Sequence, residues 1–122
     1  LVLSTYQQPP FASELPHFQR VLDGSIANVP EDEISGDGYV VHTLEASLWC
    51  LLRAETYREV VLTAVNLGED TDSTAAVAGG LAGIVWGVGS IPVEWVDGLA
   101  RIGDIHGLAE RLAEAEGGYH NE

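Results

Sequence analysis

The fold is decided by the stretch from Gly68 to Val93, which reads GEDTDSTAAVAGGLAGIVWGVGSIPV. Its first five residues hold three carboxylates, but no charged residue occurs from Ser73 to Val93. Small side chains dominate the uncharged part, and Gly89-Ser90 is a natural helix terminator. The stretch therefore predicts an acidic turn followed by a long, central helix.

The uncharged stretch is also long enough to suggest a membrane span, since about 20 apolar residues cross a bilayer. Gly79, Gly83 and Gly87 repeat at the four-residue spacing of close-packed membrane helices. However, both ends are acidic, no Lys or Arg flanks the stretch, and its Gly and Pro content makes it only weakly hydrophobic. We therefore expect a water-soluble bundle in which these glycines let neighbouring backbones approach closely.

Helical periodicity continues on both sides of this stretch. Apolar side chains recur at helical spacing from Val41 to about Ala54, and Thr56 with Glu59 matches a capping box for a helix that Gly68 ends. Strands do not alternate with helices, so the sequence predicts an all-α fold, a multi-helix orthogonal bundle of five or six helices. The remaining expected segments are a weak helix over 11–22 restricted by Pro16, an exposed acidic loop over 23–38, a short helix over 92–99, and a last helix with Asp104 as N-cap.

Composition limits the possible partners. The 122 residues, 46% of them hydrophobic, suit one globular domain. The chain has no lysine and a net charge of −14, which repels nucleic acid and anionic membrane surfaces. A phosphorylated ligand requires divalent cations to reverse this field. Cys50 is the single cysteine, so no internal disulfide forms, and a buried thiol in a reducing cytoplasm is expected.

The acidic turn has two interpretations. Asp70, Asp72 and Ser73 offer the hard oxygen ligands that Mg²⁺, Mn²⁺ or Ca²⁺ prefer, but the same carboxylates also suit a helix N-terminus as simple caps. A phosphotransferase motif with Thr74 as phosphate contact is rejected, because no strand precedes it and lysine is absent. An EF-hand loop is rejected because no glutamate follows at its twelfth position.

Three blocks of the chain, with Ile91-Pro92 and Trp95 after them, resemble the ADP-ribosylglycohydrolase family, of the type that includes the dinitrogenase-reductase-activating glycohydrolase. They occur in family order and resemble its C-terminal portion. The resemblance therefore divides the chain into a lead-in with a weak helix and acidic loop (1–33), the helical family domain (34–116) and a flexible tail (117–122). The blocks are GYVVHTLEA (38–46), AVNLGEDTDS (64–73) and GGLAG (79–83).

The resemblance implies a binuclear Mg²⁺ or Mn²⁺ centre and hydrolysis of the glycosidic bond between ADP-ribose and a protein side chain or small acceptor. It maps the metal ligands to Asp70, Asp72 and Ser73. Glu69 occupies a position where the family often has glycine or an acid, and removes no ligand. For Gly38 and Tyr39 it leaves two roles open, a border of the ADP-ribose pocket or a packing feature at a helix start.

The chain departs from the family in one respect. Nothing before Ile34 resembles the Gly-Asp and Thr-Asp-Asp motifs that hold the family's other metal ligands and its catalytic acid. We therefore expect no catalytic residue in this chain, inactivity alone, and a missing N-terminal half of the parent enzyme as a partner. Apolar surface left by lost helices predicts self-association. The alternative is a noncatalytic helical module that binds ADP-ribose or a partner protein.

A few other residues carry weaker hypotheses. Asn66 either braces the acidic turn or, as we expect, caps its own helix. His42 and Glu45 lie three residues apart and are expected to be helix neighbours rather than ligands. The three tryptophans are expected to anchor the core rather than to stack on a sugar.

Overall fold

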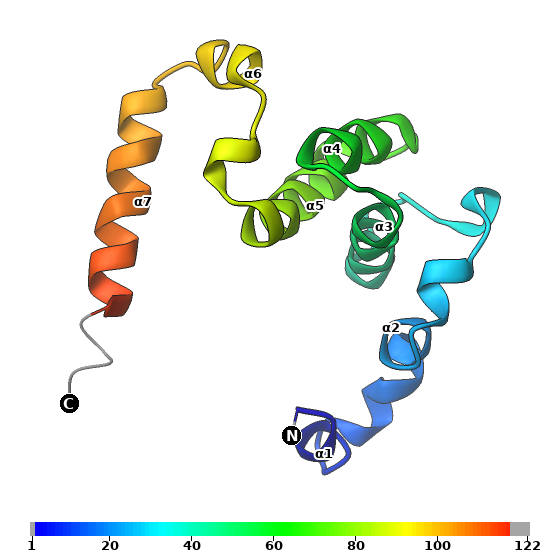
Figure 1. Cartoon of the computed structure of the whole chain (residues 1–122). Coiled ribbons are helices and arrows are strands. Elements are labelled where there is room, and N and C mark those ends of the chain that lie inside the picture. Colours follow the sequence, from blue (N-terminus) through cyan, green and yellow to red (C-terminus); the bar gives the residue numbers. More distant parts are fainter. Residues whose placement is uncertain (1, 118–122) are drawn as a thin grey trace. The chain divides into compact units, whose positions relative to one another are not determined.

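The computed structural model describes residues 2–117, and within them the chain forms helices and no strand, which confirms the predicted all-α class (Figure 1). The predicted tail lies outside the described residues, except that Gly117 is the last residue of a helix. The α-helices are α1 (Val2–Tyr6), α2 (Gln19–Leu22), α3 (Val40–Arg53), α4 (Tyr57–Asn66), α5 (Thr71–Trp86), α6 (Val93–Asp97) and α7 (Ile102–Gly117). Four 3₁₀ segments lie between them: η1 (Ala12–Phe18), η2 (Ser25–Asn28), η3 (Glu31–Glu33) and η4 (Val88–Ser90).

The chain divides into two compact units, Leu1–Ser90 and Ile91–Glu122. The first holds the core, in which α3, α4 and α5 pack together with η2 (Figure 1). Its buried side chains are mostly small, so the three helices approach closely. The core residues are Ile26, Trp49, Cys50, Val60, Ala64, Ala78 and Ala82.

Two predictions about core side chains are confirmed. Trp49 is an anchor of the core, and its indole N–H donates to the carbonyl oxygen of Val29 at 2.7 Å. Cys50 is fully buried, and burial raises the pKa of its thiol to about 11. The thiol is therefore neutral and unreactive at physiological pH.

The glycines of α5 have different roles. A Cβ at Gly79 would lie 3.3 Å from the Tyr57 hydroxyl oxygen and 3.5 Å from a methyl group of Val61, so this glycine permits the close packing of α4 on α5. At Gly83, however, nothing lies within 4 Å, so the expected close approach is wrong there. Gly87, with φ of +79°, ends the helix earlier than the sequence indicated.

Two boundaries in the first unit differ from expectation. The segment over 23–38 is not simply an exposed loop, because η2 inserts Ile26 into the core and the segment also buries Gly36. The 3.6-residue period is absent in such short turns, which is why the sequence did not reveal them. Helix α5 begins at Thr71, so Asp72 and Ser73 lie in its first turn and not before it.

The second unit contains α6, which Pro92 precedes as expected, and α7. Asp104 is not the N-cap of α7, because the helix begins two residues earlier. Its carboxylate instead pairs with Arg101 Nε at 2.6 Å. Leu108 and Leu112 are exposed within this unit. No helix within residues 2–117 combines the length and the apolar character needed to cross a bilayer.

Candidate metal centre

The turn between α4 and α5 has an unusual backbone. Gly68 ends α4 in the left-handed region with φ of +90°, as predicted, and Glu69 follows with φ of +61°. Asn66 is not part of this turn, since its amide donates to the Leu62 carbonyl oxygen at 2.6 Å, the capping role that we expected. Two consecutive residues with positive φ reverse the chain and bring Asp70 to the start of α5.

Asp70 is the N-cap residue of α5, but within the described part of the chain its carboxylate makes no capping hydrogen bond. The buried Thr74 meets the carbonyl oxygen of Asp70 instead, through its amide at 3.3 Å and its hydroxyl at 3.2 Å. In turn, the carbonyl oxygen of Thr74 accepts a hydrogen bond from the buried Ser47 hydroxyl of α3 at 3.2 Å. The backbone of Asp70 is thus fixed while its carboxylate is free of a local capping role.

Asp72 and Ser73 follow in the first turn of α5, where both are exposed. A hydrogen bond with the Asp70 carboxyl group is the main cause that lowers the pKa of Asp72, and the Ser73 backbone N–H adds to it. The two carboxyl groups are therefore close together.

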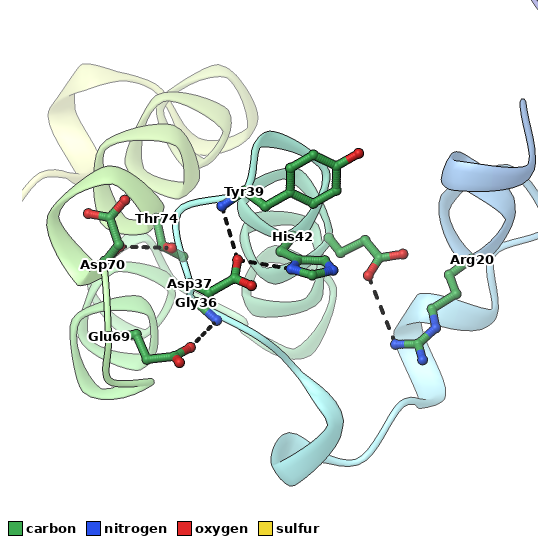
Figure 2. A network of polar contacts seen from close by, with 9 residues as sticks. Arg20, Gly36, Asp37, Tyr39, His42, Glu69, Asp70 and Thr74 are labelled. Atoms are coloured by element: carbon green, nitrogen blue, oxygen red, sulfur yellow. Dashed lines mark hydrogen bonds and ion pairs between the residues drawn. The ribbon is translucent and has the colours of Figure 1, made fainter. Parts of the chain in front are cut away.

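The segment from Gly36 to Gly38 lies directly against this turn. The Asp70 amide donates to the Gly36 carbonyl oxygen at 2.8 Å, and the Gly36 amide donates to Glu69 Oε2 at 2.8 Å (Figure 2). A Cβ at Gly36 would lie 2.8 Å from the Gly68 carbonyl oxygen, and one at Gly38 would lie 2.9 Å from Asp70 Oδ2. At Gly36 the close atom belongs to the backbone, so only glycine fits there without a shift of the turn. At Gly38 the φ of +82° favours glycine.

Tyr39 follows as the N-cap residue of α3, and its ring points away from Asp70 (Figure 2). Its amide donates to Asp37 Oδ1 at 3.0 Å, and His42 Nδ1 lies 2.9 Å from the same oxygen. These contacts hold the pKa of Asp37 below its ordinary range, the Tyr39 amide having the larger effect. The rings of Tyr39 and His42 pack edge to face with their centroids 5.0 Å apart, and this contact restrains the orientation of the tyrosine ring.

A cavity of about 510 Å³ opens beside Tyr39. His42 and Glu45 both line it, yet they have separate partners, since Glu45 faces Arg20 at 3.9 Å. Both are thus neighbours on α3, as predicted, rather than a ligand pair. Acidic, basic and aromatic side chains from the N-terminal segment and α3 complete the wall; they include His17, Arg20, Glu33 and Tyr39.

The structure thus brings together Asp70, Asp72 and Gly38, three of the five residues singled out from the sequence. The pair of adjacent carboxyl groups are oxygen donors of the kind that Mg²⁺ and Mn²⁺ prefer, so the donor chemistry fits such an ion. Among residues 2–117, no three His, Cys, Asp or Glu side chains gather into a group that could hold one.

Sequence reasoning missed the contribution of Gly36, Asp37 and Glu69. The signal for the first two was the Gly-Asp-Gly spacing just before a helix, because the aspartate of such a turn bonds the backbone two residues on. Contact between this turn and Glu69 spans 33 residues, and no local pattern predicts it.

Comparisons with known proteins identify the class. The ADP-ribosylglycohydrolase family matches over residues 2–122. The chain is 40% identical over 89 residues to the ADP-ribosylarginine hydrolase Tri1 of Serratia proteamaculans (strain 568), covering 73% of this chain and 24% of that protein. It is 38% identical over 61 residues to the ADP-ribosyl-(dinitrogen reductase) glycohydrolase of Rhodospirillum rubrum, covering 50% and 21%. It is 24% identical over 116 residues to the ADP-ribosylhydrolase ARH3 of Danio rerio, covering 84% and 31%.

The chain belongs to the ADP-ribosylglycohydrolase family. This confirms the family resemblance drawn from the three sequence blocks. The chain spans about a quarter of the length of the Serratia relative.

Proposed function

We propose that this chain is part of a metal-dependent ADP-ribosylglycohydrolase. Its role is to supply one side of a binuclear Mg²⁺ or Mn²⁺ site that hydrolyses the glycosidic bond between ADP-ribose and a protein side chain or small acceptor. The observation that carries the proposal is the Asp70 carboxylate, which stands at a helix N-terminus without capping it and beside the carboxyl group of Asp72. We place Asp70, Asp72 and Ser73 as the ligands of this side.

The residues of this chain would act by binding and orienting. When bound, the metal ions supply positive charge that orients the ribose hydroxyls and a water and stabilises charge as the bond at the anomeric carbon breaks. Asp70 and Asp72 hold that charge in place, and the fixed Asp70 backbone limits movement of the ligand. We expect the acid that performs catalysis to lie outside the residues of this chain.

We place the ADP-ribose beside Gly38 and Tyr39. The backbone at Gly38 has no side chain and is exposed, so a phosphate can approach it closely. Tyr39 presents a supported ring to a cavity large enough for part of a nucleotide, which permits stacking. The names of the relatives favour an ADP-ribosylated protein as the substrate, and the Serratia name favours arginine as the acceptor.

A chimera tests the enzymatic role. This chain replaces the matching segment of the Serratia relative, and release of ADP-ribose from an ADP-ribosylated arginine peptide is measured with Mg²⁺ or Mn²⁺. We expect the chimera to be active and its Asp70→Ala variant to be inactive with an unchanged melting temperature. A folded chimera without activity would contradict the proposal.

The chain alone is expected to release no ADP-ribose from arginine or serine peptides above background. Turnover well above background would overturn its inactivity. The cavity beside Tyr39 also supports the alternative, a noncatalytic module. Titration with ADP-ribose in the presence and absence of Mn²⁺ separates the two, because metal-dependent binding favours the enzyme part and metal-independent binding favours the module.

Exposed apolar side chains on α5 support the expectation that this chain has a protein partner. Ile84 is 83% exposed within its unit, and Val88, in the segment that follows α5, is 73% exposed. Exposed apolar surface of this kind is typical of an interface, either with another part of a complete enzyme or with a second copy of the chain. Sedimentation velocity at high protein concentration tests the second case, and a stable monomer would count against self-association.

A further inference from the structure

We propose that Glu69 is a positioning residue. It holds the turn between α4 and α5 (residues 68–70), which we call the metal turn, against the segment 36–38 that precedes Tyr39. This connection, which we call the clamp, consists of the two hydrogen bonds that Gly36 makes, one to the Glu69 carboxylate and one to the Asp70 amide. Asp70 and Tyr39 are thereby presented from one rigid unit. The functional part of this inference rests on the proposed metal site.

The geometry of the clamp is reciprocal. Residue 36 uses its amide N–H to reach the side chain of residue 69 and its carbonyl oxygen to accept from the amide of residue 70, both at 2.8 Å. Both are short bonds for an N–H donor, and the one to a carboxylate is of the stronger, charge-assisted kind. The missing side chain of Gly36 leaves the space that the Gly68 carbonyl oxygen occupies, so the two segments fit in a single register.

The backbone of Glu69 is strained, and the clamp explains why a residue other than glycine occupies this position. A φ of +61° is disfavoured for any residue with a Cβ and is most readily adopted by glycine. At this position glycine would remove the strain but also the carboxylate that Gly36 requires. The carboxylate at this position therefore serves the connection to residues 36–38.

The clamp connects Asp70, the proposed metal ligand, with Tyr39, the proposed nucleotide contact, through residues 36–38. A Cβ at Gly38 would lie 2.9 Å from Asp70 Oδ2, and the next residue is Tyr39. Because both backbone groups of Gly36 are bonded to the metal turn, a shift of the turn is expected to move residues 36–38 with it. Metal binding and nucleotide binding are expected to strengthen each other through this contact.

Amide hydrogen exchange on the full chain tests the clamp without metal or nucleotide. In Glu69→Ala we expect exchange to accelerate about tenfold at Gly36, which loses its acceptor, and also at Asp70, whose amide is bonded to the Gly36 carbonyl oxygen and not to the Glu69 carboxylate. Glu69→Gln keeps an oxygen acceptor and should restore both rates to within about threefold of wild type. Glu69→Gly should accelerate exchange like Ala while melting at a higher temperature than Ala, because it relieves the strained φ. Glu110→Ala, an exposed glutamate of α7, is the control.

Three results would overturn the inference: an unchanged Asp70 amide in Glu69→Ala, a Gln variant that behaves like Ala, or equal acceleration throughout α3 and α5. The functional part is read in the chimera described above. There Glu69→Ala should raise the Mg²⁺ concentration for half-maximal activity about tenfold with little change in kcat at saturating metal, and Gln should reverse the effect. An inactive chimera would contradict the proposed function and leave the exchange result to decide on the clamp.

Discussion

The N-cap residues of α4 and α5, Thr56 and Asp70, are both of a type that commonly caps a helix, yet the two N-termini are built differently. At α4, the Thr56 hydroxyl oxygen accepts from the Glu59 amide at 3.2 Å, and Glu59 Oε2 accepts from the Glu55 amide at 2.8 Å. At α5, the Asp70 side chain makes no such bond, and the turn is held by Gly36 from a distant segment.

The difference separates an N-cap side chain that has a structural role from one that is available to a ligand. A local cap uses the side chain to satisfy the free amides of the first turn. When the position is fixed by backbone contacts from elsewhere, the side chain is released for another purpose. The start of α4 is therefore a stability element, and the start of α5 has the features of a binding site.

The largest expected effect comes from the tertiary contact at α5. Gly36→Ala places a Cβ 2.8 Å from the Gly68 carbonyl oxygen, which is a backbone atom and cannot turn aside. We expect a loss of about 1–3 kcal/mol in the free energy of unfolding, measured by urea denaturation. Gly80→Ala, inside α5 and with nothing within 4 Å of the added Cβ, is the control and should stabilise the chain by up to about 1 kcal/mol. Equal effects of the two variants would break the comparison.

A smaller effect is expected at the local cap. Thr56→Ala removes the acceptor for the Glu59 amide and should cost about 1 kcal/mol of unfolding free energy. Thr56→Ser keeps the hydroxyl and should recover most of it. If serine did not recover stability, packing of the threonine methyl group, and not the cap, would explain the loss.

Asp70→Ala tests the same comparison at the start of α5, where we expect only a weak effect on stability. Because the side chain does not cap α5, we expect the free energy of unfolding to change by less than about 0.5 kcal/mol. The pKa of Asp72 should rise toward its ordinary value, because its main hydrogen-bond partner is lost. Urea denaturation and ¹³C NMR titration measure the two quantities. A loss as large as that of Thr56→Ala would show that Asp70 is a cap after all.

Much of the helical framework follows from local pattern. The period of apolar residues and the Thr56 capping box placed α3 and α4 within a residue or two, and Gly68 marked the end of α4. For α5 the pattern missed both ends, since small uncharged residues show no amphipathic face and Gly87 stopped the helix before Gly89. Local pattern also named Asp70 as a candidate ligand. It could not decide between cap and ligand, because that depends on Gly36, which lies 34 residues earlier in the chain.

The smallest expected effect concerns the start of α3, where Asp37 provides the local bond that Asp70 does not make. Hydrogen bonds from the Tyr39 amide and from His42 lower the pKa of Asp37, so its ionised form favours the folded state. This stabilisation is complete above the unfolded pKa and is lost as the pH falls through about 4 toward the lower folded pKa. In His42→Ala the pKa of Asp37, followed by ¹³C NMR, should rise but stay below its ordinary value, because the Tyr39 amide remains. His106→Ala, at an exposed histidine of α7, is the control and should leave the pKa of Asp37 unchanged. If the pKa of Asp37 returned fully to its ordinary value in His42→Ala, the Tyr39 amide would not bind this carboxylate.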